Sequence, residues 1–210
     1  MGIMNKLFAQ AGKPSGRFGR FIGRAMNSGH ARLHRWGLSH VSIASDVVIL
    51  DIGCGGGKAV QNMGGIAAGG KVFGIDHSDD MVQLSRKTNA VLIEAGRVEI
   101  TRASVSSLPF PDDSFDLVTA FETFYFWPDM IVDLKEVHRV LKPGGTLLIV
   151  NAAYGHEKFA KRNARITRFG GFTLHTPEEL HDVLTGAGYP DVIVHEAVKK
   201  NWIAVVAKKN

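Results

Sequence analysis

The stretch VVILDIGCGGGK, residues 47–58, decides the fold because it joins an apolar run to a glycine-rich turn. A continuous run of aliphatic residues is typical of a strand that is buried on both faces of a parallel sheet. Gly53, Gly55 and Gly57 allow the chain to turn tightly and to bring bare backbone against a ligand. The stretch therefore predicts a strand, a ligand-binding turn and a helix, with Asp51 at the end of the strand.

Two common phosphate ligands do not fit this turn. A triphosphate-binding loop needs a hydroxyl residue after its lysine, and Lys58 is followed by Ala59. A dinucleotide-binding turn needs its third glycine at position 58, and Asp51 would repel a pyrophosphate that approached the same turn. A cationic or amino-acid-like group suits the turn better.

Strand and helix patterns alternate along the rest of the chain. The expected strands are 47–51, 71–76, 98–102, 115–120, 146–151, 192–196 and 202–208, and the expected helices are 58–68, 78–95, 130–141 and one that starts at Thr176. Only residues 197–201 separate the last two strands, which is too short for a parallel crossover. The pattern predicts an α/β, Rossmann-like fold: a seven-stranded, mostly parallel sheet with an antiparallel last strand, helices on both faces and an N-terminal helical lid.

The positive charge is concentrated at the N-terminus. The chain of 210 residues has a net charge of +5, with seven Lys/Arg and no acid before Asp46. A helix is expected from Ser15, and Ser28 can cap a second one. We therefore expect a helical arm or lid over 1–40 and an α/β domain over 41–210. Such an arm suits RNA, an anionic membrane surface, an acidic substrate or simply a solvated helix face.

Composition indicates a cytoplasmic protein. No apolar run reaches the ~18 residues of a membrane span, and the N-terminus lacks the apolar core of a secretory signal. Cys54 is the single cysteine, so no internal disulfide can form. Zinc-type spacing is absent as well, and we expect no structural metal.

A second acid suggests which ligand the turn holds. Asp76 ends the second expected strand, 23 positions after Gly53, where a carboxylate can accept hydrogen bonds from both hydroxyls of a ribose. A ribose without a phosphate behind it, together with a cationic group near Asp51, describes S-adenosylmethionine.

Further motifs strengthen this interpretation. Residues 47–58 resemble motif I of the class I S-adenosylmethionine-dependent methyltransferases, and Asp76 stands where that family has its ribose-binding acid. SLPFPDDSFD at 107–116 and RVLKPGG at 139–145 resemble the family's entries to its fourth and fifth strands. The resemblance covers about 41–208 and is closest to the small-molecule branch that includes the quinone C-methyltransferases.

The resemblance implies a cofactor site. Its expected members are Asp51, Gly53, Cys54, Gly55, Gly57, Asp76, His77, Met81, Ser104, Val105 and Phe121. Ser104 stands where the family commonly has an Asp that contacts the adenine amine. A hydroxyl can still accept that hydrogen bond but carries no charge, so we expect weaker cofactor binding.

The acceptor is expected beyond strands four and five. FETFYFW, residues 121–127, could form the wall of an apolar pocket or pack against the neighbouring helix. The candidate catalytic residues are Glu122, Tyr125, His156 and His175. Glu122 could act as a base or pair with an arginine of the arm, and either histidine could act as a base or lie exposed in its loop. The insertion over 154–175 is the expected substrate lid.

Methyl transfer is an in-line displacement, so the enzyme chiefly aligns the reactants and needs a base only when the acceptor must lose a proton. The Asn-Pro-Pro-Tyr turn that serves exocyclic amines is missing, which leaves a small organic acceptor: aromatic, lipid-like or quinone-like. Nucleic acid is not the favoured partner, and membrane contact is expected to be weak and through the arm. The alternatives are an RNA or protein methyltransferase that uses the arm, a non-catalytic S-adenosylmethionine-binding protein, and a nicotinamide oxidoreductase.

Overall fold

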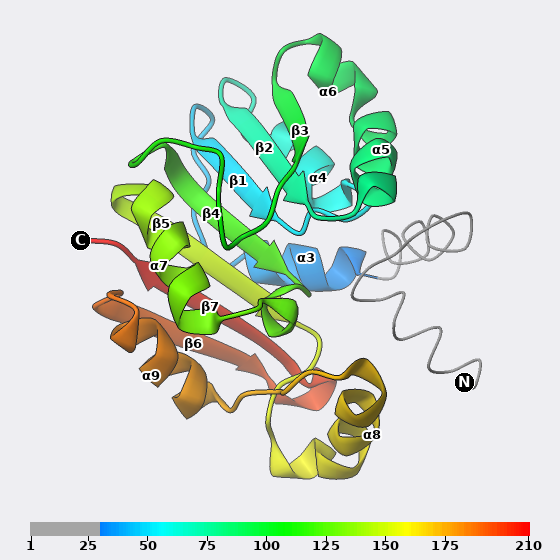
Figure 1. The fold of residues 1–210 in the computed structure, drawn as a ribbon, viewed down its shortest axis with the longest axis vertical. Helices are drawn as coiled ribbons and strands as arrows, with labels where there is room; N and C mark the ends of the chain where they lie inside the picture. Colours follow the sequence, from blue (N-terminus) through cyan, green and yellow to red (C-terminus); the bar gives the residue numbers. More distant parts are fainter. Residues whose placement is uncertain (1–29) are drawn as a thin grey trace.

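A seven-stranded sheet organises residues 30–210, the part of the chain that the computed structural model describes (Figure 1). The strands are β1 (Val48–Ile52), β2 (Lys71–Asp76), β3 (Val98–Arg102), β4 (Phe115–Phe121), β5 (Leu141–Asn151), β6 (Asp191–Ala197) and β7 (Trp202–Lys208). Their order is β3-β2-β1-β4-β5-β7-β6, and β7 is antiparallel to both of its neighbours. The pairs among β1 to β5 are parallel, which confirms the predicted fold class.

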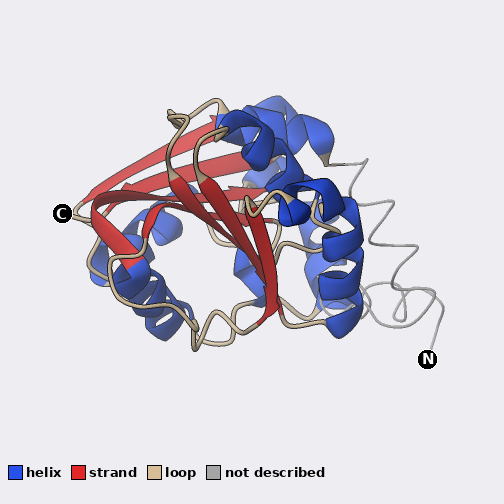
Figure 2. Ribbon diagram, turned by 90° about the horizontal axis from the view of Figure 1, so that it is seen from above, coloured by secondary structure: helices blue, strands red, loops and turns tan. Residues whose placement is uncertain are grey.

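Helices cover both faces of this sheet (Figure 2). They are α3 (Ala31–Leu38), α4 (Lys58–Ile66), α5 (Asp79–Thr88), α6 (Ala90–Glu94), α7 (Met130–Val140), α8 (Ala160–Gly170) and α9 (Pro177–Gly186), with short 3-10 turns η1 (Phe124–Phe126), η2 (Glu157–Phe159) and η3 (Val198–Lys200). Leu33 of α3 and Val60 of α4 belong to the core on one face. Leu134 of α7 and Leu184 of α9 belong to the core on the other.

Local sequence explains where three helices begin. The Ser78 side chain accepts the backbone N–H of Met81 and so caps α5. Asp129 caps α7 in the same way. At α9, Thr176 and Glu179 form a reciprocal capping box followed by proline in the first turn, as their spacing predicts.

Tertiary contacts correct two predicted boundaries. The single helix expected over 78–95 is divided into α5 and α6 at Asn89, whose side chain donates to the carbonyl of Gly57 over 3.0 Å. The fifth strand, expected from residue 146, begins already at Leu141, which pairs with Phe115 of β4. Both corrections depend on neighbours that are distant in the sequence.

The first described helix, α3, packs directly on the sheet. Leu33 is 2% exposed, and a Cβ at Gly37 would lie 2.5 Å from the side chain of Val150 in β5. This close approach places the last turn of α3 against the carboxyl end of β5. The helix expected from Ser15, the Ser28 cap expected for the second helix, and residues 1–29 of the lid expected over 1–40 lie outside the described part of the chain. Within residues 30–210, no helix combines the length and the apolar character that a membrane crossing requires.

Candidate functional site

A cavity of about 360 Å³ lies beyond the carboxyl ends of β1, β2 and β4. The chain order of the strands reverses between β1 and β4, which is where open α/β sheets bind their ligands. The structure brings most of the predicted site residues to its wall: Asp51, Gly53, Cys54, Gly55, Asp76, His77, Met81, Ser104, Val105, Phe121 and Glu122. Thr123, Phe126 and Trp127, from the segment that the sequence offered as a pocket wall, also line it, and sequence reasoning missed His30, His34 and Pro128.

The three glycines of the turn have different surroundings. All three have positive φ, at 69° for Gly53, 49° for Gly55 and 80° for Gly57, which L side chains rarely adopt. A Cβ at Gly55 would meet open space beside the cavity, with its nearest neighbour 4.0 Å away. A Cβ at Gly57 would lie 2.3 Å from Ser85 Oγ, so Gly57 lies against α5 and outside the described cavity wall.

Asp76 joins this turn to the end of β2. Its carboxylate accepts the backbone N–H of Gly55 over 2.9 Å and that of Ser78 over 2.8 Å. Burial raises the pKa of Asp76, although these two N–H groups oppose the shift. A carboxylate has about four acceptor positions, and the backbone of His77 also contributes a hydrogen bond, which still leaves acceptor capacity for a ribose hydroxyl. The residue therefore fits the sugar of a nucleoside that carries no phosphate.

Asp51 lies beneath the same turn. It is 2% exposed and accepts the hydroxyl of Thr119 over 2.7 Å. Burial raises the pKa of Asp51 to about 7, the charge of Asp76 adds to the shift, and the Thr119 hydroxyl opposes it. A buried carboxylate of this kind favours a cation beside it. The site therefore suits a ligand that combines a ribose with a positive centre.

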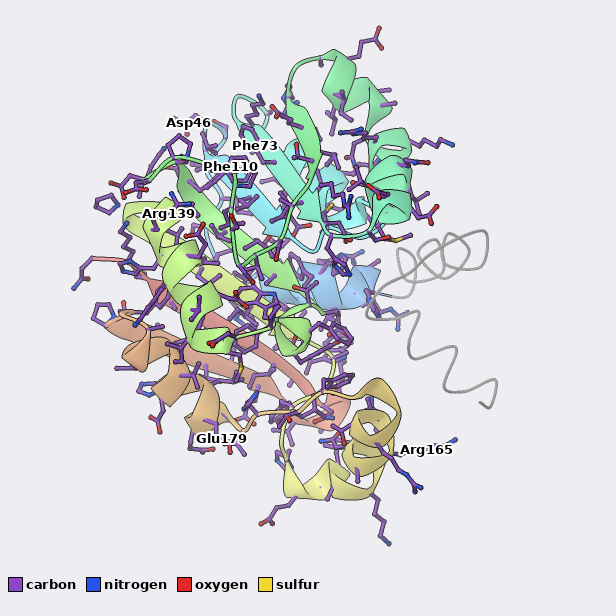
Figure 3. All side chains as sticks on the ribbon, in the orientation of Figure 1. Asp46, Phe73, Phe110, Arg139, Arg165 and Glu179 are labelled. Atoms are coloured by element: carbon purple, nitrogen blue, oxygen red, sulfur yellow. The ribbon has the colours of Figure 1, made fainter. Side chains whose placement is uncertain are left out.

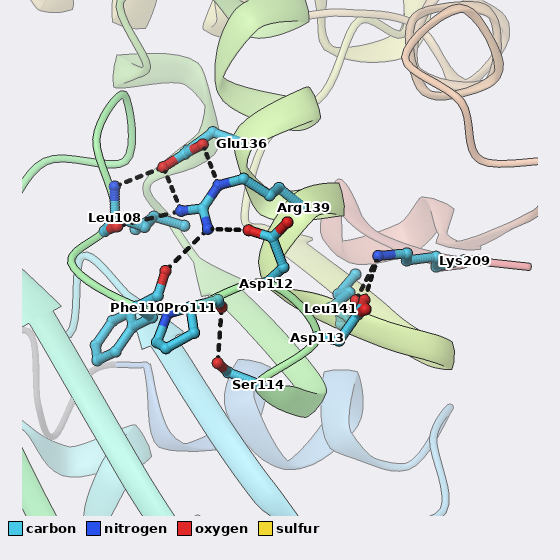
Figure 4. Close-up of polar contacts among 10 residues, drawn as sticks. All are labelled: Leu108, Phe110, Pro111, Asp112, Asp113, Ser114, Glu136, Arg139, Leu141 and Lys209. Carbon is cyan, nitrogen blue, oxygen red and sulfur yellow. Dashed lines mark hydrogen bonds and ion pairs between the residues drawn. The ribbon is translucent and has the colours of Figure 1, made fainter.

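The loop that carries Ala103, Ser104 and Val105 closes one side of the cavity. Arg139 of α7 holds the following segment by donating to the carbonyls of Leu108, over 3.2 Å, and Phe110, over 2.9 Å (Figure 4). The motifs 107–116 and 139–145 are thus joined by one guanidinium, and neither lines the cavity. Their role is to position the loop that does.

Two acids complete the Arg139 contacts. Asp112 accepts from the guanidinium over 2.7 Å, and Glu136 accepts both from it and from the backbone N–H of Leu108. Phe110 adds an apolar anchor, with its ring centroid 5.5 Å from that of Phe73, its labelled neighbour in Figure 3. Polar contacts with Arg139 and the apolar contact of Phe110 therefore fix the segment that follows the cavity loop.

Glu122 lies at the end of β4, on the opposite side of the cavity. It has a positive φ of 61°, and its carboxylate accepts the Tyr125 hydroxyl over 3.1 Å and the backbone N–H of Ala152. Burial raises the pKa of Glu122, while the charges of His30 and Arg162 and both donors oppose the shift. The carboxyl group is therefore held in place by groups from three parts of the chain.

The other three candidate catalytic residues do not line this cavity, as far as residues 30–210 describe it. Tyr125 stacks on Phe172 with ring centroids 4.5 Å apart, and contacts the site only through Glu122. The His156 ring accepts the backbone N–H of Lys158 and caps η2. The His175 ring lies 3.5 Å from Glu179, at the start of α9. Neither histidine is therefore on the described cavity wall that Glu122 lines.

Two histidines that sequence reasoning missed contribute to the cavity instead. His34 is 7% exposed, and its ring lies on Phe121 with centroids 4.6 Å apart. His30, one turn earlier, lies edge-on to His34 with centroids 6.2 Å apart. The i, i+4 spacing of two histidines was the signal available in the sequence, since such residues share one helix face.

Comparison with known proteins identifies the class. Residues 50–149 match the family model described as a methyltransferase domain. The fold resembles that of an S-adenosylmethionine-dependent methyltransferase from Aquifex aeolicus, with a TM-score of 0.72, 21% identity, and coverage of 92% of this chain and 100% of that one. Human N-acetylserotonin methyltransferase in complex with S-adenosylmethionine gives a TM-score of 0.74 at 17% identity, covering 90% of this chain and 55% of that one. Residues 50–149 therefore resemble a methyltransferase domain, and the chain has the Rossmann-like fold of these S-adenosylmethionine-dependent methyltransferase structures.

Two proteins of known name are similar to this chain in sequence. A ubiquinone/menaquinone biosynthesis C-methyltransferase from Geotalea daltonii is 33% identical over 132 residues, which is 62% of this chain and 56% of the relative. A demethylmenaquinone methyltransferase from Lactiplantibacillus plantarum is 31% identical over 133 residues, which is 63% of this chain and 56% of the relative. This chain thus aligns with little more than half of the length of either protein.

Proposed function

We propose that this protein transfers the methyl group of S-adenosylmethionine to a small organic acceptor that carries a ring hydroxyl, such as a hydroquinone. The observation that carries the proposal is the composition of the wall of the cavity described above. One side offers Asp76, the glycine turn and Asp51, and the other offers Glu122 among the rings of Phe126 and Trp127. The quinone-pathway relatives support the choice of acceptor.

On the cofactor side, this chain's residues bind and orient. S-adenosylmethionine supplies a methyl group on a sulfonium and leaves as a neutral thioether. Asp76 accepts the ribose hydroxyls, Gly55 allows close backbone approach, and Asp51 favours the positive charge. Holding both reactants in line accounts for a large part of the rate enhancement in such reactions.

On the acceptor side, the aromatic wall excludes water and favours a flat apolar ring. Trp127 is 9% exposed, and within residues 30–210 its Nε1 donor has no hydrogen-bond partner. Because the Nε1 atom is buried, Trp127 offers the cavity apolar ring surface, which suits a flat acceptor ring.

The test uses labelled methyl donor and the purified full chain. Reduced demethylmenaquinone with a short side chain, simple phenols and bulk RNA serve as acceptors, and mass spectrometry identifies the product. We expect label in the hydroquinone or the phenols. Label in RNA, with salt-sensitive binding that is lost when residues 1–29 are removed, would instead support the alternative enzyme. Tight cofactor binding without any transfer would support a non-catalytic protein.

A further inference from the structure

Three acids line the described cavity wall, and they divide between its two sides. Asp51 lies beneath the glycine turn, and Asp76 accepts the backbone N–H of Gly55, so both belong to the cofactor side. The third acid, Glu122, directly follows Phe121 at the end of β4 and is half-buried. Glu122 is therefore the carboxyl group that the described wall offers to the acceptor.

The segment after β4 packs directly against the glycine turn. The Thr123 hydroxyl donates to the carbonyl of Ile52 over 3.1 Å, and a Cβ at Gly53 would overlap the Thr123 side chain. Glu122 is the residue before Thr123, so its backbone lies next to the boundary between the cofactor side and the acceptor side. Proton transfer during methyl transfer requires a group at this boundary, because the acceptor atom must face the methyl carbon.

Two donors from different parts of the chain orient the Glu122 carboxyl group. The Tyr125 hydroxyl donates to Oε2 over 3.1 Å, and the backbone N–H of Ala152 donates to Oε1. The φ of 61° at Glu122 is uncommon for a residue other than glycine, and such conformations cluster at active sites. Each carboxylate oxygen has two acceptor positions, so each keeps one after these bonds. The side chain is thus held in place and can still accept a proton from a ligand.

An aromatic contact joins this carboxyl group to the insertion between β5 and α9. The Phe172 ring, after α8, stacks on Tyr125 with centroids 4.5 Å apart, and lies edge-on to Phe126 with centroids 5.2 Å apart. Phe126 itself lines the cavity. Tyr125 is therefore fixed by its ring as well as by its hydroxyl, and it holds Glu122 in a constant position relative to the cavity.

Two neighbouring titratable groups are poorer proton acceptors than Glu122. Burial lowers the pKa of His34 to about 4, and the charge of His30 adds to the shift. Burial and the charge of Glu122 raise the pKa of Tyr125, so its hydroxyl keeps its proton and acts as a donor. Burial also raises the pKa of Glu122, although the charges of His30, before α3, and Arg162, of α8, oppose the shift together with the two donors. A carboxylate in such a position is more basic than an exposed one.

From this arrangement we infer that Glu122 is the catalytic base on the acceptor side, and that Tyr125 is the positioning residue that orients its carboxylate. The inference rests on the proposed function. In the step, the acceptor O–H bond breaks and its proton forms an O–H bond on the Glu122 carboxylate. The electron pair left on the acceptor forms the bond to the methyl carbon, while the carbon–sulfur bond breaks and its electrons stay on the sulfur. If a ring carbon is methylated, the proton of that carbon then restores the hydroxyl, and in either case Glu122 passes one proton to solvent.

The first test compares Glu122→Gln with His30→Asn, at another residue of the cavity wall, and with Glu94→Gln, a matched change at an exposed glutamate of α6. With reduced demethylmenaquinone as the acceptor, we expect Glu122→Gln to lower kcat roughly 10²–10⁴-fold near pH 7. The rise of kcat with pH should disappear in this variant, because the base must be ionised to act. The Kd for S-adenosylmethionine should stay within about twofold, and Glu94→Gln should match the wild type. Retention of kcat within twofold in Glu122→Gln, or loss of the rise with pH in His30→Asn alone, would overturn the inference.

Tyr125→Phe tests the positioning role, because it removes the hydroxyl and keeps the ring that stacks on Phe172. The Glu122 carboxylate then loses a donor to its charged form, so the pKa of Glu122 should rise. The pH at which kcat reaches half of its maximum should therefore move upward by roughly half a unit or more. An unshifted pH profile in Tyr125→Phe would contradict the role of Tyr125.

A third measurement does not depend on turnover. NMR titration of ¹³C-labelled glutamate carboxyl groups gives the pKa of Glu122 in the full chain, with Glu122→Gln to assign the signal. This pKa should lie above the ordinary glutamate value of about 4.3 and should rise further in Tyr125→Phe. A Glu122 pKa at or below the ordinary value would overturn the inference. If the wild type methylates no acceptor but the raised pKa is observed, the proposed function fails while Glu122 is supported as the proton acceptor of the cavity.

Discussion

The carboxylate of Asp76, at the end of β2, accepts the backbone N–H of Gly55, in the turn after β1, over 2.9 Å. One side chain therefore both holds the glycine turn and faces the cavity that we assign to the cofactor. The arrangement couples the shape of the turn to the group that would accept the ribose hydroxyls. It leads to the first prediction.

Asp76→Ala should weaken binding of S-adenosylmethionine by about 1–3 kcal/mol, or roughly 5- to 150-fold, because the ribose hydroxyls lose their acceptor. Titration calorimetry measures the change. Asp79→Ala is the matched control, since Asp79 follows three residues later and its side chain is 68% exposed. Equal affinities for Asp76→Ala and the wild type would remove the ribose assignment.

Cofactor binding should release protons near neutral pH. The pKa of Asp51 is about 7 in the free protein, and a bound cation favours the ionised form, so the pKa falls on binding. The affinity for S-adenosylmethionine should therefore rise as the pH increases toward about 7 and level off above it. Calorimetry in two buffers with different ionisation enthalpies detects the proton release. S-adenosylhomocysteine, which lacks the sulfonium, should release fewer protons, and Asp51→Asn should show no such release.

The guanidinium of Arg139 should stabilise the fold without touching the cofactor. Arg139→Ala removes contacts to Leu108, Phe110 and Asp112, and should lower the free energy of unfolding by about 1–3 kcal/mol. Urea unfolding measures the loss. Arg165→Ala is the control, because Arg165 is exposed on α8 and points away from the body of the protein (Figure 3). A loss of the same size in both variants would contradict the prediction.

Two glycines near β1 should respond oppositely to alanine. Gly57→Ala places a Cβ 2.3 Å from Ser85 Oγ at a positive φ, and should lower the free energy of unfolding by about 1–3 kcal/mol. Gly65→Ala, inside α4 with open space around the new Cβ, should raise it by about 0.5–1 kcal/mol. Thermal unfolding of the two variants compares them directly. The prediction fails if Gly57→Ala is as stable as the wild type.

Some elements of the fold follow from local sequence alone. Strands β2, β3 and β7 begin and end where the pattern placed them, since a buried strand is defined by its own apolar run. The start of α9 follows from Thr176, Pro177 and Glu179 alone. Asp76 could be assigned to the cavity because a residue that ends a parallel strand lies at the ligand-binding edge of the sheet.

Other features depend on partners that the sequence does not place. Asn89 ends α5 because Gly57 lies beside it, and nothing in the local pattern of that helix indicates the interruption. His30 reaches the cavity because α3 packs on β5, whereas the composition of its segment suggested only a basic arm. His156 and His175 had the right residue type, but His156 caps η2, His175 lies beside Glu179, and neither lines the described cavity.

The sequence by itself determined the alternation of strands and helices, the glycine turn and the acid that we assign to the cofactor. These features depend on the hydrophobic period of each segment and on the spacing of residues that are close in the sequence. The tertiary structure decided which side chains line the cavity together, since α3, the turn after β1 and the segment after β4 meet there from distant parts of the sequence. Residues that are adjacent in the sequence determine the local backbone conformation. Packing between distant segments determines which side chains meet in the pocket.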